Sequence, residues 1–384
     1  MAHPRIRMGD SEMRFTCQKD ELARALSSVQ RAISARGPMP ILANVLLTSD
    51  GQGLRLSGTD LNLGIETHMA ADIATGGSIT VPARNLADIV GKLPNAEVTL
   101  TVSDRNILVT CQRAKFTLAT ESADQFPSLP QADAAQEVRL PASVLRQGIH
   151  NTVYAAANRD DMSVVSGVHI AMADGVLEMV ATDGYRLAAW RYGGVGSQVF
   201  SATIPAKAMS ELERLLGQDE GDVLVAEAAR SDDGLVGGTQ MVFTSGGRKL
   251  TTRRISGQYP NYRQVIPAQF RNETMVDRLS LLKAVDRTGT MASERDGRAL
   301  RVTFTEGALI LQARNAESGE AEERVDAELR GDSQDIVFNA QYLQQALERV
   351  EGETVVIKTN GPVEATMFQG ADDRLTALVM PIRS

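Results

Sequence analysis

An internal repeat limits the folds open to this chain more than any other feature of its sequence. The segment TIPAKAMSELERLL, which begins at Thr203, follows the pattern of TVPARNLADIVGKL, which begins at Thr80. The same offset of 123 residues separates LRLSGTD, which begins at Leu54, from LEMVATD, which begins at Leu177. Two motifs that keep one spacing indicate a duplicated structural unit.

A weaker third copy follows in the same order, with LILQARN from Leu309 and VFNAQYLQQALERV from Val337. Each copy also carries an earlier helical pattern, in KDELARALSSVQRAIS, PASVLRQGIHNTVYAAA and SLLKAVDRTGTMA. A length of 384 residues suits two or three domains of ordinary size. We therefore expect three homologous domains, over residues 13–132, 133–266 and 267–384.

The local patterns indicate the fold class. Short segments such as EVTLTV and NILVTC alternate apolar and polar residues, which is typical of half-buried antiparallel strands. Two segments in each copy have a helical period instead. In the first of them one face carries Leu22, Leu26, Val29 and Ile33. The fold class is therefore predicted to be α+β, in which each domain packs two helices on antiparallel sheets.

Composition excludes several classes of protein. The chain is 43% hydrophobic, yet no apolar run approaches the roughly 18 residues that cross a bilayer, so we expect a soluble, cytoplasmic protein that binds no membrane. Cys17 and Cys111 lie far apart and form no C-x-x-C pair, which disfavours a disulfide framework or a zinc site. Residues 1–12 lack the apolar segment of a secretory signal and are interpreted as an extension or a remnant of expression. We expect no metal and no cofactor, because metal-ligand spacing is missing among His3, His68, His150 and His169.

Positive charges gather in or beside the predicted helices, although the chain has a formal net charge of -8. Arg84 and Lys207 occupy the same position in the repeated helix, while acidic residues collect elsewhere, as in ESGEAEERVDAE from Glu317. One interpretation is that these Lys and Arg residues are the ordinary charged residues of a solvent-exposed helix face. The other is that the same bias in six helices forms a basic surface that holds a polyanion.

Catalysis finds little support in the sequence. The motifs G-x-x-x-x-G-K-[ST], G-x-S-x-G and H-E-x-x-H are all missing. Ser280 and Lys283 form the S-x-x-K pattern of penicillin-binding proteins, but S-D-N and K-T-G do not accompany it. Ser280 opens a predicted helix, where we expect it to act as a cap. We therefore expect no enzymatic activity, and a scaffold that binds peptides without nucleic acid remains a further alternative.

Seven motifs follow one another along residues 13–384, namely PMPILANVLL, GTDLNLGIE, VPARNLADI, QFPSLP, ATDGYRLA, YPNYRQVIP and LVMPIRS. In this order they resemble the bacterial β sliding clamp family, the processivity subunit of the replicative DNA polymerase III holoenzyme. The resemblance implies a ring of two chains joined head to tail, with three similar domains in each chain. Helices would line the hole, and sheets would lie outside.

Simple geometry is consistent with two chains. Helices packed side by side lie roughly 10 Å apart. Six of them close a circle about 19 Å across, which leaves roughly 9 Å of free bore once one helix diameter is subtracted. Twelve helices leave about 28 Å, which is enough for duplex DNA with a major groove about 12 Å wide. Two chains therefore form the smallest ring that admits a duplex.

The resemblance implies the partners and the charged residues that meet them. Double-stranded DNA would be the polyanion, and its candidate ligands are Arg24, Arg36, Arg84, Arg159, Lys207 and Arg295. The other implied partners are a second copy of the chain, a clamp loader, the alpha subunit of the replicative DNA polymerase, and other polymerases and repair proteins. These proteins would bind through a short apolar peptide motif.

A pocket for that peptide is implied between the second and third domains. The matching positions are Val165, Thr182, Gly184, Tyr185, Arg186, Leu187, Pro260, Val265, Asn339, Tyr342, Leu378, Met380, Pro381 and Ile382. Tyr185 stands where the family often has His, Gln264 where an Arg can occur, and Val164 where some members have a larger aromatic residue. The alternative is that the segment from Leu378 to Ile382, with a Pro inside it, forms only an ordinary last strand.

Overall fold

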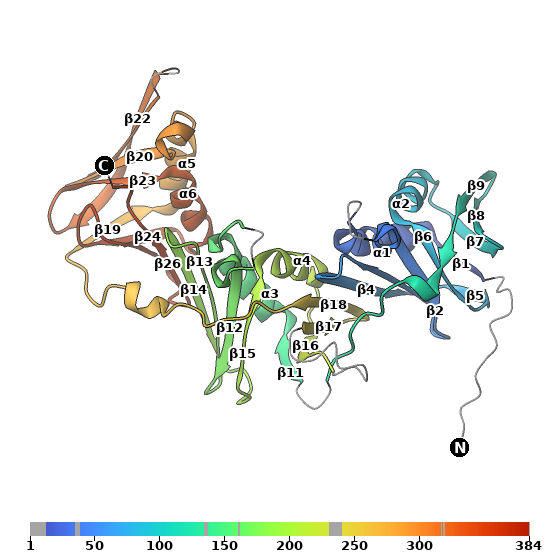
Figure 1. Ribbon diagram of the computed structural model, residues 1–384. Helices are drawn as coiled ribbons and strands as arrows, with labels where there is room; N and C mark the ends of the chain where they lie inside the picture. The colour runs from blue at the N-terminus through green and yellow to red at the C-terminus, as the bar shows by residue number, and fades with distance from the viewer. Residues whose placement is uncertain are drawn as a thin grey trace. The chain divides into compact units, whose positions relative to one another are not determined.

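The computed structural model describes residues 13–34, 39–133, 137–159, 162–229, 240–315, 317 and 319–383. The chain divides into two compact units (Figure 1). The first unit combines Met1–Ser143 with Arg214–Arg253, and the second combines Val144–Glu213 with Arg254–Ser384. Each unit therefore contains part of the central predicted domain.

The order of elements repeats three times, as a strand, a helix, a group of strands, a second helix and a final group of strands, four in the first copy and three in each of the others. The first copy contains β1 (Arg14–Gln18), α1 (Lys19–Val29), β2 (Asn44–Ser49), β3 (Leu54–Thr59), β4 (Leu63–Met69), β5 (Asp72–Thr75), β6 (Ser78–Pro82), α2 (Ala83–Lys92), β7 (Glu97–Ser103), β8 (Asn106–Cys111), β9 (Ala114–Ala119) and β10 (Glu121–Ser122). The second copy contains β11 (Val138–Pro141), α3 (Ala142–Thr152), β12 (Gly167–Ala173), β13 (Val176–Thr182), β14 (Arg186–Gly193), β15 (Phe200–Pro205), α4 (Ala206–Leu216), β16 (Asp222–Glu227), β17 (Gln240–Ser245) and β18 (Arg248–Arg253).

The third copy contains β19 (Asn272–Asp277), α5 (Arg278–Gly289), β20 (Ala299–Thr305), β21 (Ala308–Asn315), β22 (Gly319–Arg330), β23 (Gln334–Asn339), α6 (Ala340–Arg349), β24 (Thr354–Thr359), β25 (Thr366–Gln369) and β26 (Leu375–Val379). The repeated helix of the sequence is α2 in the first copy, α4 in the second and α6 in the third. The structure therefore confirms the internal repeat and the α+β class.

Three antiparallel sheets form the framework. The first unit holds a sheet in the order β5-β1-β7-β8-β9 and a second in the order β10-β6-β2-β3-β4-β18-β17-β16-β11. The second unit holds one sheet in the order β15-β12-β13-β14-β26-β25-β24-β19-β22-β21-β20-β23. In two places strands of neighbouring copies pair directly, β4 with β18 and β14 with β26. The sheets therefore continue from one copy of the repeat into the next.

The first helix shows why these segments become helical. Leu22, Leu26 and Val29 are fully buried on one face of α1, which contacts α2 and strands β3 and β4 (Figure 1). The expectation that Ile33 extends this face of the helix is wrong. A 3-10 turn over Gln30–Ala32 ends the helix, and Ile33 is extended and half-buried. Burial of the apolar face, rather than helix propensity, fixes the element.

The start of α5 also differs from the expectation. Asp277 is the N-cap, and its carboxylate accepts a hydrogen bond from the Ser280 backbone N–H at 2.7 Å. Ser280 is therefore the third residue of the helix, and its predicted role as the cap is wrong. Both Ser280 and Lys283 are exposed on the helix surface. This arrangement accounts for the S-x-x-K spacing as ordinary helix sequence.

The described residues were compared with the expectations about membrane spans, metal ligands and cysteines. No helix among them is long and apolar enough to cross a membrane. Within the same part of the chain, no three or more His, Cys, Asp or Glu side chains are grouped so that they could hold a metal ion. Cys17 and Cys111 are free thiols, and both are buried.

Candidate nucleic-acid and peptide interfaces

The repeated helix presents a cation at its second position in two copies. Strand β6 ends at Pro82 and strand β15 at Pro205, so α2 and α4 begin one residue later. Arg84 and Lys207 are therefore structurally equivalent, and both are exposed. The third copy departs from this pattern, because the second residue of α6 is Gln341.

Arg84 and Arg24, two of the helical cations, make only weak local contacts. The Arg84 Nε lies 4.0 Å from the Asp88 carboxylate, and the Arg84 side chain is 89% exposed. On α1 the exposed Arg24 donates from its Nε to the backbone oxygen of Asp20 at 3.2 Å. Exposed pairs of this kind contribute about 0 to 1 kcal/mol to stability, so they leave the charges available to a ligand.

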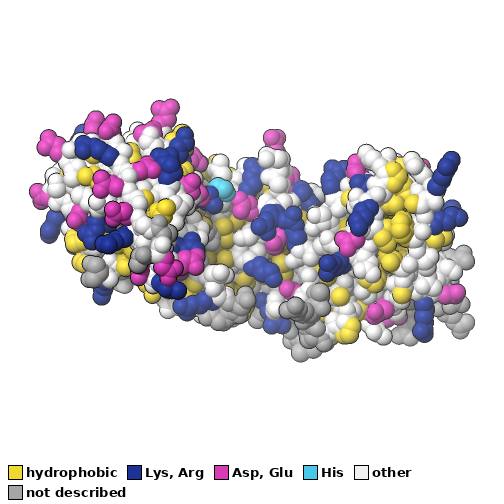
Figure 2. Space-filling view, turned by 90° about the horizontal axis from the view of Figure 1, so that it is seen from above, with side chains coloured by type: hydrophobic (Ala, Val, Ile, Leu, Met, Phe, Trp, Pro, Cys, Tyr) yellow, Lys and Arg dark blue, Asp and Glu magenta, His cyan; other side chains and the backbone are white. Residues whose placement is uncertain are grey.

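Two of the predicted cations lie outside the helices. Arg159 is exposed in the segment after α3, and Arg295 lies in a 3-10 turn over Glu294–Asp296. Arg295 pairs with Glu317 at 2.9 Å, so its charge is partly balanced. Arg36 lies outside the described residues. Figure 2, which looks from above the view of Figure 1, shows Lys and Arg side chains on the face of each unit, together with Asp and Glu side chains.

The predicted peptide pocket centres on the seam between β14 and β26. Leu187 and Leu378 face each other across this seam and are each 3% exposed. They belong to one buried apolar cluster that also contains Tyr262, with Met380 packed against it. The structure therefore brings together residues that are far apart in the sequence, but Leu187 and Leu378 form the floor of this region rather than its open surface.

Arg186 contacts side chains of α6 beside the same seam. Its Nε donates to the Asp183 carboxylate at 3.0 Å, and it also donates to Gln345. Its guanidinium lies 4.3 Å from the centre of the Tyr342 ring and 5.6 Å from that of Tyr154. Burial raises the pKa of the Tyr342 hydroxyl, with Asp183 acting in the same direction. Arg186 and Tyr342 are therefore fixed relative to each other before any ligand arrives.

The C-terminal segment is held by backbone hydrogen bonds after the last strand has ended. The Met380 N–H donates to the Tyr185 oxygen, and the Ile382 N–H to the Val337 oxygen, both at 2.7 Å. Strand β26 ends at Val379, so the expectation that Pro381 lies inside the last strand is wrong. Pro381 is buried beyond the strand, where its missing N–H costs no sheet hydrogen bond.

The remaining predicted residues have different roles. Asn339 caps α6 by accepting from the N–H groups of Gln341 and Tyr342, and Thr182 accepts from the Gly184 N–H at 3.1 Å. The side chains that are open to a partner are those of Tyr185, which is 65% exposed, and Val265, which is 54% exposed. Pro260 is also exposed. Three other predicted contacts are half-buried, namely Val165, Met380 and Ile382.

A carboxylate that the sequence analysis missed lies under the segment that carries Pro260 and Val265. Glu178 of β13 is 9% exposed and accepts hydrogen bonds from Tyr262, Arg263 and Arg191. Burial raises the pKa of this carboxyl, but the three hydrogen-bond donors outweigh burial and hold the pKa below its ordinary value. The one signal in the sequence is an acidic residue inside the otherwise apolar strand LEMVA.

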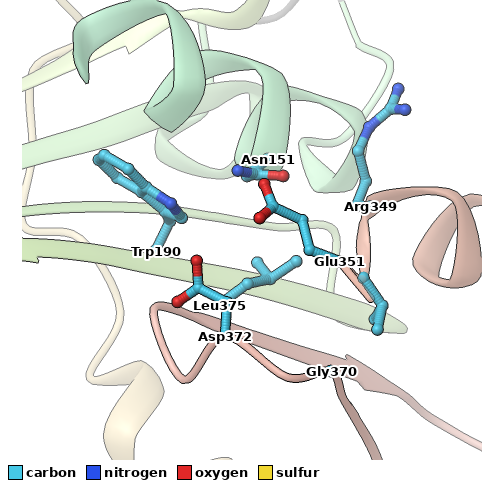
Figure 3. Close-up of a pocket in the computed structure, with 8 residues that line it drawn as sticks. Asn151, Trp190, Arg349, Glu351, Gly370, Asp372 and Leu375 are labelled. Atoms are coloured by element: carbon cyan, nitrogen blue, oxygen red, sulfur yellow. The ribbon is translucent and has the colours of Figure 1, made fainter. Parts of the chain in front are cut away.

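A small pocket lies near the same seam but is a different site (Figure 3). Its lining consists of Asn151, Trp190, Arg349, Val350, Glu351, Gly370, Asp372 and Leu375. The carboxylates of Glu351 and Asp372 both lie near Arg374, which is 3.8 Å from Glu351 and donates from its Nε to Asp372 at 2.5 Å. Arg374 therefore balances only part of this negative charge. None of the predicted peptide contacts lines the pocket.

Three family models match successive parts of the chain. They describe the N-terminal, central and C-terminal domains of the DNA polymerase III beta subunit and cover residues 13–130, 139–261 and 263–383. Among curated proteins, the beta sliding clamp of Synechococcus elongatus is 35% identical over 97% of this chain and 99% of its own length. That of Pseudomonas aeruginosa is 33% identical over 97% of this chain and 100% of its own length.

Solved structures give the same result. The DNA polymerase sliding clamp of Bacillus subtilis has a TM-score of 0.89 at 26% identity, covering 97% of this chain and 100% of the other. A sliding clamp of Pseudomonas aeruginosa bound to griselimycin has a TM-score of 0.87 at 31% identity, with the same coverage. The chain belongs to the DNA polymerase III beta subunit family, the beta sliding clamps that make replicative DNA synthesis processive.

Proposed function

We propose that two copies of this chain join head to tail into a ring that encloses duplex DNA and tethers the polymerase to it. The observation that carries this proposal is the equivalent, exposed position of Arg84 and Lys207 on α2 and α4. Cations that recur on one repeated helix can touch the phosphates of any sequence, which permits sliding. Arg24, Arg36, Arg159 and Arg295 join them in this proposal.

The free edge of the five-stranded sheet supports assembly. Strand β9 is the last strand of that sheet, and Phe116 on it is 41% exposed, while Leu108 on neighbouring β8 is 37% exposed. Apolar side chains along an open edge favour pairing with another chain. We assign this edge of the first domain to the contact with the third domain of the second copy.

The domain limits proposed for the ring are residues 13–132, 133–266 and 267–384. The family models support three domains of similar size, with matches over 13–130, 139–261 and 263–383, although the third match begins four residues before the limit proposed at 267. Residues 1–12 lie before the first match and belong to none of the three domains in this proposal.

The region around Leu187, Tyr185, Val265 and Met380 is the proposed binding site for partner peptides. Exposed apolar side chains rest there on a buried floor, an arrangement that suits short apolar anchors such as Leu and Phe. A clamp loader, the polymerase alpha subunit, other polymerases and repair proteins would compete for it. Relatives from Pseudomonas aeruginosa and Bartonella birtlesii have been solved with griselimycin bound, which supports a ligand site in the family.

The proposed mechanism needs no catalytic step and no cofactor. Its effect comes from effective concentration, because a polymerase linked to a ring around DNA stays near the primer end. A family role in DNA replication supports a cytoplasmic location. The protein would act there as a non-enzymatic processivity factor.

Retention on closed and open DNA tests the ring. Protein placed on nicked circular duplex by its clamp loader should stay bound in high salt and leave when the circle is cut. An ordinary basic patch would be lost from circles in salt, because its affinity falls steeply with ionic strength. Sedimentation gives a second measure, with an expected mass twice the 41.3 kDa of one chain. Loss from circles in high salt, or a monomer at micromolar concentration, would contradict the ring.

A further inference from the structure

We propose that Glu178 is a positioning residue for the peptide site, which it serves by holding the segment from Tyr259 to Ile266 against the sheet. This inference rests on the proposed function of that site. The segment carries Pro260 and Val265, two of the proposed peptide contacts, and it joins the second copy of the repeat to the third.

Glu178 accepts hydrogen bonds from two sides, the segment and the sheet. Its Oε1 accepts from the Tyr262 hydroxyl and from Arg263 Nη2 at 2.8 Å, and Arg263 Nη2 is also 3.0 Å from Oε2. From the sheet, Arg191 donates its Nε to Oε2 at 2.5 Å. Glu178 and Arg191 are cross-strand neighbours on β13 and β14. The carboxylate therefore connects the segment to a rigid pair of strands.

The segment has few other ties to the sheet. Its backbone hydrogen bonds are local, from Tyr262 to Pro260, from Gln264 to Asn261 and from Ile266 to Arg263. Its side-chain anchors are apolar or aromatic. Tyr262 is buried in the cluster with Leu187, and Tyr259 and Ile266 pack against that cluster. The Tyr259 ring also stacks on His169, with centroids 4.9 Å apart. Arg263, Gln264 and Val265 are exposed.

These contacts fix the position of Val265. Val265 follows Arg263 by two residues inside one 3-10 turn, Tyr262–Val265, so the ion pair to Glu178 fixes the turn that carries it. Hydrogen bonds to a buried charged group are stronger than neutral ones. Without the carboxylate, Arg263 loses its ion pair with Glu178. Packing of the Tyr262 side chain then becomes the main contact between the turn and the sheet.

The test compares Glu178→Gln with Arg263→Gln, which breaks the same link from the other side. A labelled peptide with Leu and Phe anchors is titrated by fluorescence anisotropy. Each single variant should bind about fivefold more weakly. The double variant should lose less than the product of the two single losses, because the link between Glu178 and Arg263 is common to both changes. Glu273→Gln is the matched control, since Glu273 is also paired across strands, with Lys358 at 3.7 Å. It should bind as the wild type does.

Hydrogen exchange separates this inference from the proposed function. In Glu178→Gln the amides of residues 261–266 should exchange faster, while those of β13 and β14 should not change. Wild-type affinity in Glu178→Gln, additive losses in the double variant, or unchanged exchange would each overturn the inference. If the wild type binds no peptide, the proposed peptide site fails, and exchange alone decides whether Glu178 positions the segment.

Discussion

Substitution of Val265 by Ala offers a sharp test of the peptide site, because this side chain is open in the free protein. The change removes two methyl groups, each worth about 0.8 kcal/mol when fully buried. In the structure Val265 is 54% exposed, so that fraction is still available to a partner. A peptide that covers the side chain would therefore lose about 0.9 kcal/mol, which is about fivefold in Kd.

The measurement is anisotropy of a labelled peptide with Leu and Phe anchors, alongside the thermal midpoint of unfolding. Val199→Ala is the matched control, because Val199 belongs to the same unit, is 82% exposed and lies outside the proposed site. It should leave the Kd unchanged. Equal Kd values for Val265→Ala and the wild type would refute the reasoning, and so would an equal loss in the Val199 variant.

Three further outcomes follow from charge, burial and capping. Arg84→Ala with Lys207→Ala should weaken direct DNA binding and flatten its salt dependence by up to about four units of slope, because a ring of two chains loses four cations. Titration at several salt concentrations measures the slope, and unfolding should change little. Burial, aided by Glu21, raises the pKa of the Cys17 thiol to about 12, so a thiol reagent at pH 8 should label Cys17 only after unfolding. Asp277→Ala should lower the midpoint of unfolding in denaturant titrations, because the helix loses its cap, and Asp277→Asn should restore most of the loss.

The sequence predicted those parts of the fold that depend on periodicity. In strand β7 the buried residues Val98, Leu100 and Val102 alternate with less buried ones, as the segment EVTLTV indicated. The offset between the first two copies holds in the structure because α2 begins at Ala83 and α4 at Ala206. Such patterns are readable because each reflects one face of one element.

Element ends and long-range contacts were harder to predict. Both Asp277 and Ser280 are residue types that cap helices, and only the backbone conformation decides that the Asp277 carboxylate reaches the Ser280 N–H. The tie between Glu178 and Arg263 spans 85 positions, so no local pattern could reveal it. Leu187 and Leu378 were chosen by resemblance, and their burial depends on the pairing of β14 with β26.

The pairing of β4 with β18 and of β14 with β26 has a consequence for anyone who divides this protein into fragments. A central repeat produced alone would expose the backbone N–H and C=O groups along one edge of β18 and one edge of β14, which would still pair with β17 and β13 on the other side. Open edges of this kind recruit other strands and promote aggregation. Neighbouring repeats therefore share a sheet at each of these two pairings, and a fragment boundary placed between repeats would cut that sheet open.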